Sequence, residues 1–314
     1  MGYFKLAILL FIISAPTTDS FGQASHFTKS DHWKNQRKSV LLGFGVTNFL
    51  GDIGGRDKEG VHFSPLDMDW NSTRYAGHLG FRFRIAPNFA TKTLLQYALF
   101  AGDDNLTHQP NRRNRNIQFQ THLFEISQQF EFILARNEQF GSRHRRYGLK
   151  GFRPKAFQVY LFSGLSFFGY IPQGRGGEYG WTNLRPLKTE GQGLNNDESA
   201  YERYSFGIPI GVGYKIGLTP MWSMSCELSY THTFTDYLDD VSGNYFDNKL
   251  IESNYGTKAA YFADPSLGPF PELTAAGQSR GNSDYNDVYL YFNISFIRNV
   301  SYKRTVKTRR KHTR

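Results

Sequence analysis

Apolar and polar side chains alternate along eight segments of this chain with a period of two residues. In the clearest segment, 204–216, every second residue is Tyr, Phe, Ile or Val, and the residues between them are Ser, Gly, Pro or Lys. Segment 222–235 repeats the pattern, with Trp222, Met224 and Leu228 opposite a row of Ser, Glu and Thr residues. Successive side chains of a strand point to opposite faces. Both segments are therefore predicted strands with one apolar and one polar face.

Six further segments show the same period less cleanly. They are 40–50, 75–84, 89–101, 122–134, 157–170 and 288–296. A tilted strand that crosses a bilayer needs about 9 to 11 residues. Each of the eight segments is long enough to do so.

The connections between the predicted strands differ in length in a regular way. Links 85–88 and 217–220 are tight turns. The long links are 51–73, 171–203 and 237–286. An even strand count, with short turns on one side and long loops on the other, is typical of outer-membrane barrels. Link 137–155 is the exception, because it is long although it lies at the end of the barrel where tight turns are expected.

We therefore predict an all-β fold, an eight-stranded antiparallel transmembrane outer-membrane β-barrel with long extracellular loops. A soluble β-sandwich would explain the alternation, but it would not explain the strand length or the one-sided loops. The interior of so narrow a barrel is filled by side chains. The predicted inward positions carry charges of both signs, at Arg82, Arg84, Glu125, Glu131, Lys215 and Glu227. We expect buried ion pairs and a lumen that does not conduct.

The first residues of the chain predict secretion. Lys5 precedes an apolar run from Leu6 to Ile13, and the small residues Ser20 and Gly22 precede a cleavage position. This order describes a secretory signal peptide. The predicted organisation is a signal peptide at 1–22, a periplasmic segment at 23–38, the barrel at 39–297 and a basic periplasmic tail at 298–314. The expected location is the outer membrane, with both termini in the periplasm.

Composition excludes two other classes of protein. Only 39% of the 314 residues are apolar, and no run reaches the roughly 18 apolar residues that a membrane-spanning helix needs. The single cysteine, Cys226, excludes a disulfide within the chain. Cys226 lies on the apolar phase of its strand, so we interpret it as a small apolar filler.

The net charge of +10 is concentrated in two segments. Residues 135–155 contain seven cations and one acid, and residues 301–314 contain seven cations and no acid. A dense cluster of one sign attracts an acidic partner or surface. The candidate partner-binding residues are Arg143, Arg145, Arg146, Lys303, Arg304, Lys307, Arg309, Arg310 and Lys311. The alternative is a solvated segment that aids solubility or assembly, and the compartment argues against nucleic acid.

Carboxylates of the long loops are the main candidates for chemistry. They are Asp52 and the pairs Asp103-Asp104 and Asp239-Asp240. Paired carboxylates can bind a cation or act in acid–base catalysis, but in loops they are ordinarily solvated or cap turns. The sequence lacks EF-hand spacing, a two-His zinc motif and a G-x-S-x-G elbow. We predict no catalytic residue, cofactor, metal site or small-molecule substrate.

Five loop strings, taken in order, resemble one family. They are Asn48–Gly55, Gly102–Asp104 with Arg113–Asn116, Thr189–Gly193, Thr235–Ser242 and Arg280–Asn282. Together they resemble the PorG-like outer-membrane barrels of the Bacteroidota type IX secretion system. The residues of this loop motif that we single out are Asp52, Thr189, Glu190, Gly191, Gln192, Gly193, Asp236, Tyr237, Asp239 and Asp240. Gly191 and Gly193 are expected to hold positive φ angles in a fixed turn.

The resemblance implies a non-enzymatic barrel that links the outer membrane to a periplasmic ring of PorK-like and PorN-like proteins. It carries no catalytic residue over to this chain. The competing interpretations are a small outer-membrane porin or adhesion barrel and, further away, a lipid-modifying barrel enzyme. Such an enzyme would use the carboxylates of the outer rim.

Overall fold

The computed structural model describes residues 33, 36–53, 70–106, 109–137, 156–194, 200–266 and 268–300. These residues belong to the second of two units, 33–314, into which the chain divides. The predicted signal peptide and all nine candidate partner-binding cations lie outside the described residues.

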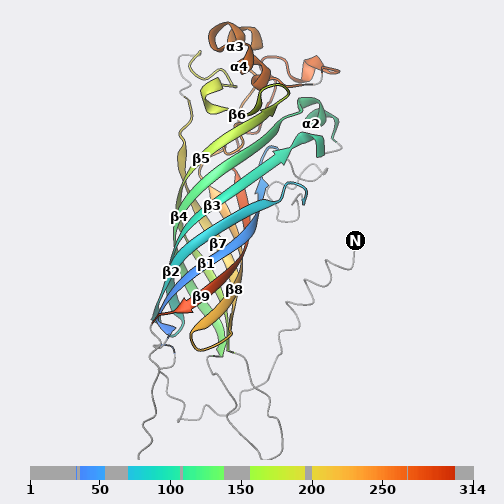
Figure 1. The fold of residues 1–314 in the computed structure, drawn as a ribbon. Coiled ribbons are helices and arrows are strands. Elements are labelled where there is room, and N and C mark those ends of the chain that lie inside the picture. The colour runs from blue at the N-terminus through green and yellow to red at the C-terminus, as the bar shows by residue number, and fades with distance from the viewer. Residues whose placement is uncertain are drawn as a thin grey trace, which may run out of the picture. The chain divides into compact units, whose positions relative to one another are not determined.

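The described strands close into a barrel (Figure 1). Their bounds are β1 (Lys38–Leu50), β2 (Arg74–Ala86), β3 (Phe89–Asp103), β4 (Gln118–Asn137), β5 (Phe157–Gly176), β6 (Gly180–Asn183), β7 (Tyr204–Gly217), β8 (Trp222–Thr233) and β9 (Val288–Asn299). Strands that follow one another pair in antiparallel fashion, except that β7 pairs with β5, and β9 returns to pair with β1. The short β6 pairs with the end of β5 and takes no part in the closure. The predicted eight-stranded antiparallel barrel is confirmed.

Each strand turns one apolar face outward, as the period predicts. Ile210 on β7 is 57% exposed and Leu228 on β8 is 50% exposed, whereas Ser225 on the opposite phase is 1% exposed. Cys226 lies on the outward phase and is partly exposed. The outer wall is therefore a broad surface of exposed Leu, Ile, Val and aromatic side chains.

The barrel interior holds a network of ion pairs. The Arg82 Nε atom lies 2.6 Å from Glu131 Oε2, and Lys92 Nζ lies 2.7 Å from Glu227 Oε1 and 3.6 Å from Glu131 Oε1. The Tyr160 hydroxyl also donates to Glu227. Arg82, Glu131 and Glu227 of the expected set form ion pairs, whereas Glu125 accepts hydrogen bonds from Tyr289 and Tyr291, and Arg84 donates to the Pro87 carbonyl. Lys92 is missing from the predicted set because its neighbours Thr91 and Thr93 obscure the alternation of β3.

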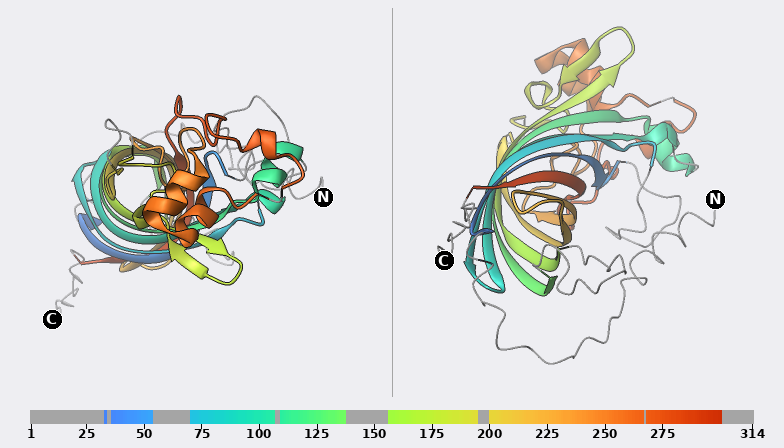
Figure 2. Two further views of the ribbon diagram at one scale, coloured as in Figure 1. Left: turned by 90° about the horizontal axis from the view of Figure 1, so that it is seen from above. Right: turned by 60° about the horizontal axis from the view of Figure 1, so that its bottom comes forward.

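Strands β4 and β5 are longer than the pattern predicts. β4 begins at Gln118, opposite Asp103 at the end of β3, and β5 continues to Gly176, beyond the start of β7 at Tyr204, with β6 beside it (Figure 1). The outward side chains of this extension are polar, so the apolar half of the alternation is absent there. Helices α2, α3 and α4 lie at this end of the barrel (Figure 1), and the view from above shows them over one side of the ring of strands (Figure 2).

The long connections contain short helices. These are α2 (Pro110–Arg115), α3 (Asn248–Tyr255) and α4 (Thr257–Ala263), with the 3₁₀ turns η3 (Asp104–Leu106), η4 (Arg185–Leu187) and η5 (Pro271–Leu273). Asp247 caps α3 by accepting a hydrogen bond from Lys249 N. Among the described residues, no helix has both the length and the apolar content to span a membrane.

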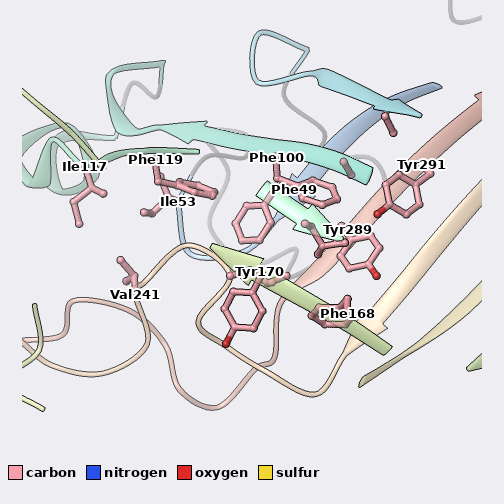
Figure 3. Packing of buried hydrophobic residues seen from close by; sticks show 14 residues of the cluster. Phe49, Ile53, Phe100, Ile117, Phe119, Phe168, Tyr170, Val241, Tyr289 and Tyr291 are labelled. Atoms are coloured by element: carbon pink, nitrogen blue, oxygen red, sulfur yellow. The ribbon is translucent and has the colours of Figure 1, made fainter. Parts of the chain in front are cut away.

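A cluster of buried aromatic side chains fills the loop end of the barrel. Figure 3 shows Phe49, Phe119, Phe168 and Tyr289 of this cluster, which come from four different strands and their ends. Phe49 and Phe119 meet edge to face with 5.1 Å between their ring centroids. Loop residues such as Val241 complete the cluster. The loops are therefore anchored to the barrel by an apolar core of their own.

Candidate functional site

The ten residues of the predicted loop motif all lie in one structure, which we call the cap. The cap consists of the described residues in the connections 51–73, 104–117, 177–203 and 234–287. Buried charged side chains join these four connections to one another. The site is therefore assembled from the described residues of these four connections.

Arg115 makes the first of these junctions. Its guanidinium donates two hydrogen bonds to the Asp104 carboxylate, both of 2.8 Å. It also donates to the carbonyl oxygens of Asp52, at 2.8 Å, and Arg280, at 2.7 Å. The paired charge of Asp104 raises the pKa of Arg115, against the opposing effect of burial. One side chain at the end of α2 thus holds three loops.

Arg280 makes the second junction. Its Nη1 atom lies 3.0 Å from Glu190 Oε1 and 2.7 Å from the carbonyl oxygen of Asp240. The same Glu190 oxygen accepts hydrogen bonds from the backbone N–H groups of Ser242 and Gly243. The connection between β5 and β7 is thereby joined to both ends of the connection between β8 and β9.

The carboxylates of Asp52, Asp239 and Asp287 accept hydrogen bonds from backbone N–H groups. Asp239 accepts from Ile53 N at 3.3 Å and from Val241 N at 3.0 Å. Asp52 and Asp287 accept from Asn282 N at 2.8 Å and from Leu238 N at 2.9 Å, respectively. These acids fix the course of the loops, because a buried N–H group without a partner is costly.

Asp240 is held by two hydroxyl groups. Thr189 donates to its Oδ2 atom at 2.6 Å, and Tyr201 donates to its Oδ1 atom. The Tyr201 ring stacks on Tyr237, with 4.5 Å between the centroids and 9° between the planes. Tyr237 therefore packs within the cap, and Thr189 donates a hydrogen bond to a buried acid.

The string at 189–193 forms the predicted turn. Gly191 and Gly193 have φ angles of 74° and 87°, the left-handed region that glycine adopts without steric cost. Gly191 also lies against the Phe246 ring, which a Cβ atom would meet at 2.4 Å. Gln192 is buried, and its Oε1 atom accepts from Glu190 N. The expectation of positive φ at both glycines is confirmed.

Four acids of the cap share a crowded region. Burial raises the pKa of Asp236 to about 8. Burial, with the nearby charges of Asp52 and Asp236, raises the pKa of Asp239 well above its usual range. Burial and the charge of Asp239 do the same for Asp287. Burial also raises the pKa of Asp240, to about 6, although the Arg280 charge opposes this shift.

The expectation that the loop carboxylates are solvated or simple turn caps is wrong for several of them. Asp104, Asp239 and Asp240 are buried. Asp104 accepts from Arg115 and Ile117 N, Asp239 accepts from backbone N–H groups, and Asp240 accepts from two hydroxyl groups. Asp103 is half-buried and accepts from Gln118. In the part of the chain that the structure describes, no three His, Cys, Asp or Glu side chains are grouped so that they could hold a metal ion.

Several residues of the network are absent from the predicted motif. Arg115 and Arg280 occur in the family-like strings, but their role needs partners from distant loops, and Asp104 takes its role from Arg115. Asp287 and Tyr201 lie outside those strings, and no local pattern marks them. Contacts between residues more than 50 positions apart define this site, for example Thr189 with Asp240.

Comparison with known proteins finds similar solved structures but no family. No protein-family model matches the sequence, and no curated protein matches it. Three of the solved structures that resemble this chain are those of Neisserial surface protein A, of OprG from Pseudomonas aeruginosa, and of Ail, which is the attachment invasion locus protein of Yersinia pestis. The values below are given in the order Ail, Neisserial surface protein A, OprG. Identities are 8%, 8% and 9%, and TM-scores are 0.33, 0.34 and 0.33. The matches cover 83% of this chain and 99%, 96% and 96% of those chains. At these values the barrel assignment rests on the strand register above.

Proposed function

We propose that this protein is a non-enzymatic outer-membrane component of the type IX protein secretion system, similar to PorG-like barrels. One observation carries the proposal: the loop strings that resemble this family are the ones that build the buried cap. Asp52, Arg115, Glu190, Asp240 and Arg280 come from all five strings and meet in one network. A shared, interlocked cap is a better reason for the resemblance than five unrelated loops.

The outer wall and the interior support an outer-membrane location without channel activity. A closed barrel with an exposed apolar belt, exemplified by Leu42 and Phe130, satisfies its own backbone and presents lipid-compatible side chains. The interior is occupied by the pairs Arg82–Glu131 and Lys92–Glu227. The cap acids accept hydrogen bonds from Arg115 and Arg280, from backbone N–H groups and from the hydroxyls of Thr189 and Tyr201. These features favour a structural role over a porin or a barrel enzyme.

The proposed partner is the periplasmic ring of PorK-like and PorN-like proteins. In this proposal the short turns and the last residues of β9 face the periplasm, and the sequence predicts that Arg143, Arg145 and Arg146 and the tail cations lie on the same side. Exposed charges are screened by salt, with a Debye length of about 8 Å at physiological ionic strength. An electrostatic attachment to an acidic ring surface should therefore weaken as salt rises.

Co-purification from solubilised outer membranes tests this function. The intact barrel should capture ring proteins, and replacement of the three loop arginines by Glu should weaken capture more than replacement by Ala. Because β9 runs to Asn299, two residues beyond the predicted barrel end, the tail truncation is best placed after Val300. Undiminished capture by the Glu-substituted barrel and by the truncated barrel, at low and at moderate salt, would refute the role of the basic segments. Absence of ring proteins from the intact barrel would refute the secretion role.

A further inference from the structure

The extension of β4, β5 and β6 beyond the barrel has one face that no other element of the described chain covers. Its inner face packs on the cap, where Phe119 is fully buried and Cβ atoms at Gly174 would meet Leu184 and Phe262. Its outer face continues the outward phase of β4 and β5. We call this outer surface the amide face; its residues are Gln118, Gln120, Gln173, Arg175, Trp181 and Asn183.

The centre of the amide face is a row of three aligned amides on three strands. Gln120 is the register partner of Gln173, and Gln173 is the partner of Asn183. Gln120 Nε2 donates to Gln173 Oε1 at 2.9 Å, and Gln173 Nε2 donates to Asn183 Oδ1 at 3.0 Å. Strands lie about 4.8 Å apart, so the row extends over roughly 10 Å.

The amides retain capacity for a ligand. Each primary amide has two N–H donors and a carbonyl that accepts two hydrogen bonds. The row uses one N–H group of Gln120 and one of Gln173, and it leaves both N–H groups of Asn183 available to an outside partner. Mutual hydrogen bonds hold the side chains in fixed positions, which lowers the entropy cost of binding.

An aromatic ring and a cation lie beside the row. Trp181, 43% exposed, is the register partner of Arg175, which is also exposed. Planar amides that donate and accept, next to an exposed indole, match the hydroxyl groups and the apolar C–H face of a sugar ring. A guanidinium in the same patch pairs with phosphate or carboxylate groups. At the β3 edge of the face, the Asp103 carboxylate already accepts hydrogen bonds from Gln118 Nε2 and Asn105 N. The amides, the indole and the guanidinium together fit a saccharide that carries anionic groups better than a purely apolar ligand.

The position of the amide face identifies which saccharide it meets. On the same side of the same strands, the last large apolar residues are Phe124 on β4 and Ile171 on β5, which are 58% and 40% exposed. Gln120 and Gln173 follow four and two residues further along. At about 3.3 Å per residue, the amides begin roughly 7–13 Å beyond the apolar belt along the strands, and somewhat less along the barrel axis because the strands tilt. In an outer membrane this is the layer of lipid headgroups.

We propose that the amide face binds the saccharide headgroup of the outer-leaflet glycolipid. This inference rests on the proposed outer-membrane location, but it is independent of any contact with a secretion ring. It gives the long β4–β5–β6 extension a role that barrel closure does not require, since β6 is outside the closed ring of strands. Bound headgroups would hold the barrel at a fixed depth and rotation in the membrane.

Titration calorimetry on the folded, full-length barrel in detergent tests the inference. The probe is the deacylated oligosaccharide of lipopolysaccharide, which lacks acyl chains and cannot bind the apolar belt. Gln120→Ala with Gln173→Ala, and separately Trp181→Ala, should each weaken binding by about tenfold or more, the loss typical of one or two hydrogen bonds or a stacked ring. Heat-modifiable gel mobility confirms that each variant is folded.

Gln128→Ala is the matched control. Gln128 is an exposed amide on the outward side of the same strand, but it lies within the apolar belt and bonds Thr91 and Thr93. Its replacement should leave the affinity for oligosaccharide unchanged. Equal affinity of wild type and both amide-face variants, or no binding by wild type, would overturn the proposal. Equal binding of an unrelated neutral glucan would overturn the assignment to the glycolipid. Because the titration contains no ring protein, its failure is separate from a failure of the secretion role.

Discussion

Single buried charges determine how the cap is held together. Arg115 serves an acid and two carbonyl groups at once, and Arg280 serves Glu190 and the Asp240 backbone. A buried ion pair adds little stability compared with an apolar replacement of the same shape, but the loss of one partner leaves an uncompensated charge. The cap is therefore specified by residues that are hard to replace one at a time.

Arg115→Ala should open the cap. Asp104 would stay buried without its cation, at a cost of about 3–5 kcal/mol, and two carbonyl groups would lose their donor. The measurement is the rate of limited proteolysis in the loops of the folded barrel. Arg113→Ala is the control, because Arg113 is exposed on the same helix. Equal protease sensitivity of the two variants would contradict the assigned role.

The stability of the cap should fall as pH rises from about 4 to 8. The pKa of an ordinary Asp is about 3.9 in an unfolded chain, whereas burial raises the pKa of Asp240 to about 6 and of Asp236 to about 8 in the cap. The folded state therefore binds more protons in this interval, so stability decreases with pH and levels off above the folded pKa. The measurement is the protection of residues 234–266 against hydrogen exchange, relative to the intrinsic exchange rate at each pH, at pH 5 and at pH 8. Asp236→Asn should reduce the difference in protection between the two pH values. An unchanged difference would contradict the assigned role of Asp236.

At the scale of an element, the turn at 189–193 shows how a loop acquires one conformation. Its two glycines supply φ angles that other residues adopt at a cost, and Gln192 and Glu190 hydrogen-bond within and across the turn. The turn places Thr189 and Glu190 against Asp240 and Arg280. The backbone geometry of the turn thus positions two side chains of the long-range network.

Replacement of Gly191 and Gly193 by Val should disorder this turn while the barrel stays folded. A non-glycine residue at positive φ costs about 1–3 kcal/mol, and a side chain at 191 would also collide with Phe246. Faster proteolysis between β5 and β7, with unchanged heat-modifiable mobility, is the expected result. Gly177→Ala tests the specificity, because a Cβ atom there meets the Tyr261 hydroxyl at an ordinary 3.8 Å.

The outward face of β7 is the second element to test. Ile210 lies in the middle of the strand, opposite Ser163 on β5 and Tyr230 on β8. An arginine there should destabilise the barrel in a bilayer by about 2–4 kcal/mol, the cost of Arg near the midplane. Ser225→Thr changes an inward position and should cost much less. Equal losses in the folded, fast-migrating band on unheated gels would disprove the assigned facing.

For the whole molecule, the filled interior predicts a barrel that does not conduct ions. The ion pairs around Glu131 and Glu227 occupy the middle, and the aromatic cluster with Phe119 and Tyr289 occupies the loop end. Planar-bilayer recording of the purified protein should therefore show no steady conductance, with a porin of about 16 strands as the positive control. A stable open level would restore the porin interpretation.

The strands were predictable from the sequence and the cap network was not. A period of two depends on neighbouring residues, so the segment beginning at Tyr204 is readable from its own sequence. Asp239, in contrast, acquires its role from Ile53, which is 186 positions away. The ends of β4 and β5 were missed because the outward residues there, such as Gln120, are polar. Helix α3 did carry a signal, the N-cap Asp247 followed by Ile251 and Tyr255.

The long-range bonds of the cap also constrain the order in which the protein matures. Ile53 meets Asp239, Asp52 meets Asn282, and Ser39 bonds Asn299 across the seam where β9 joins β1. Contacts of such sequence separation form late, because chain entropy must be lost before they stabilise anything. The loop that contains Asp239 and Asn282 ends only where β9 begins. The cap can therefore lock only after the last strand has arrived, and protease-resistant loops become a marker of barrels that have finished folding.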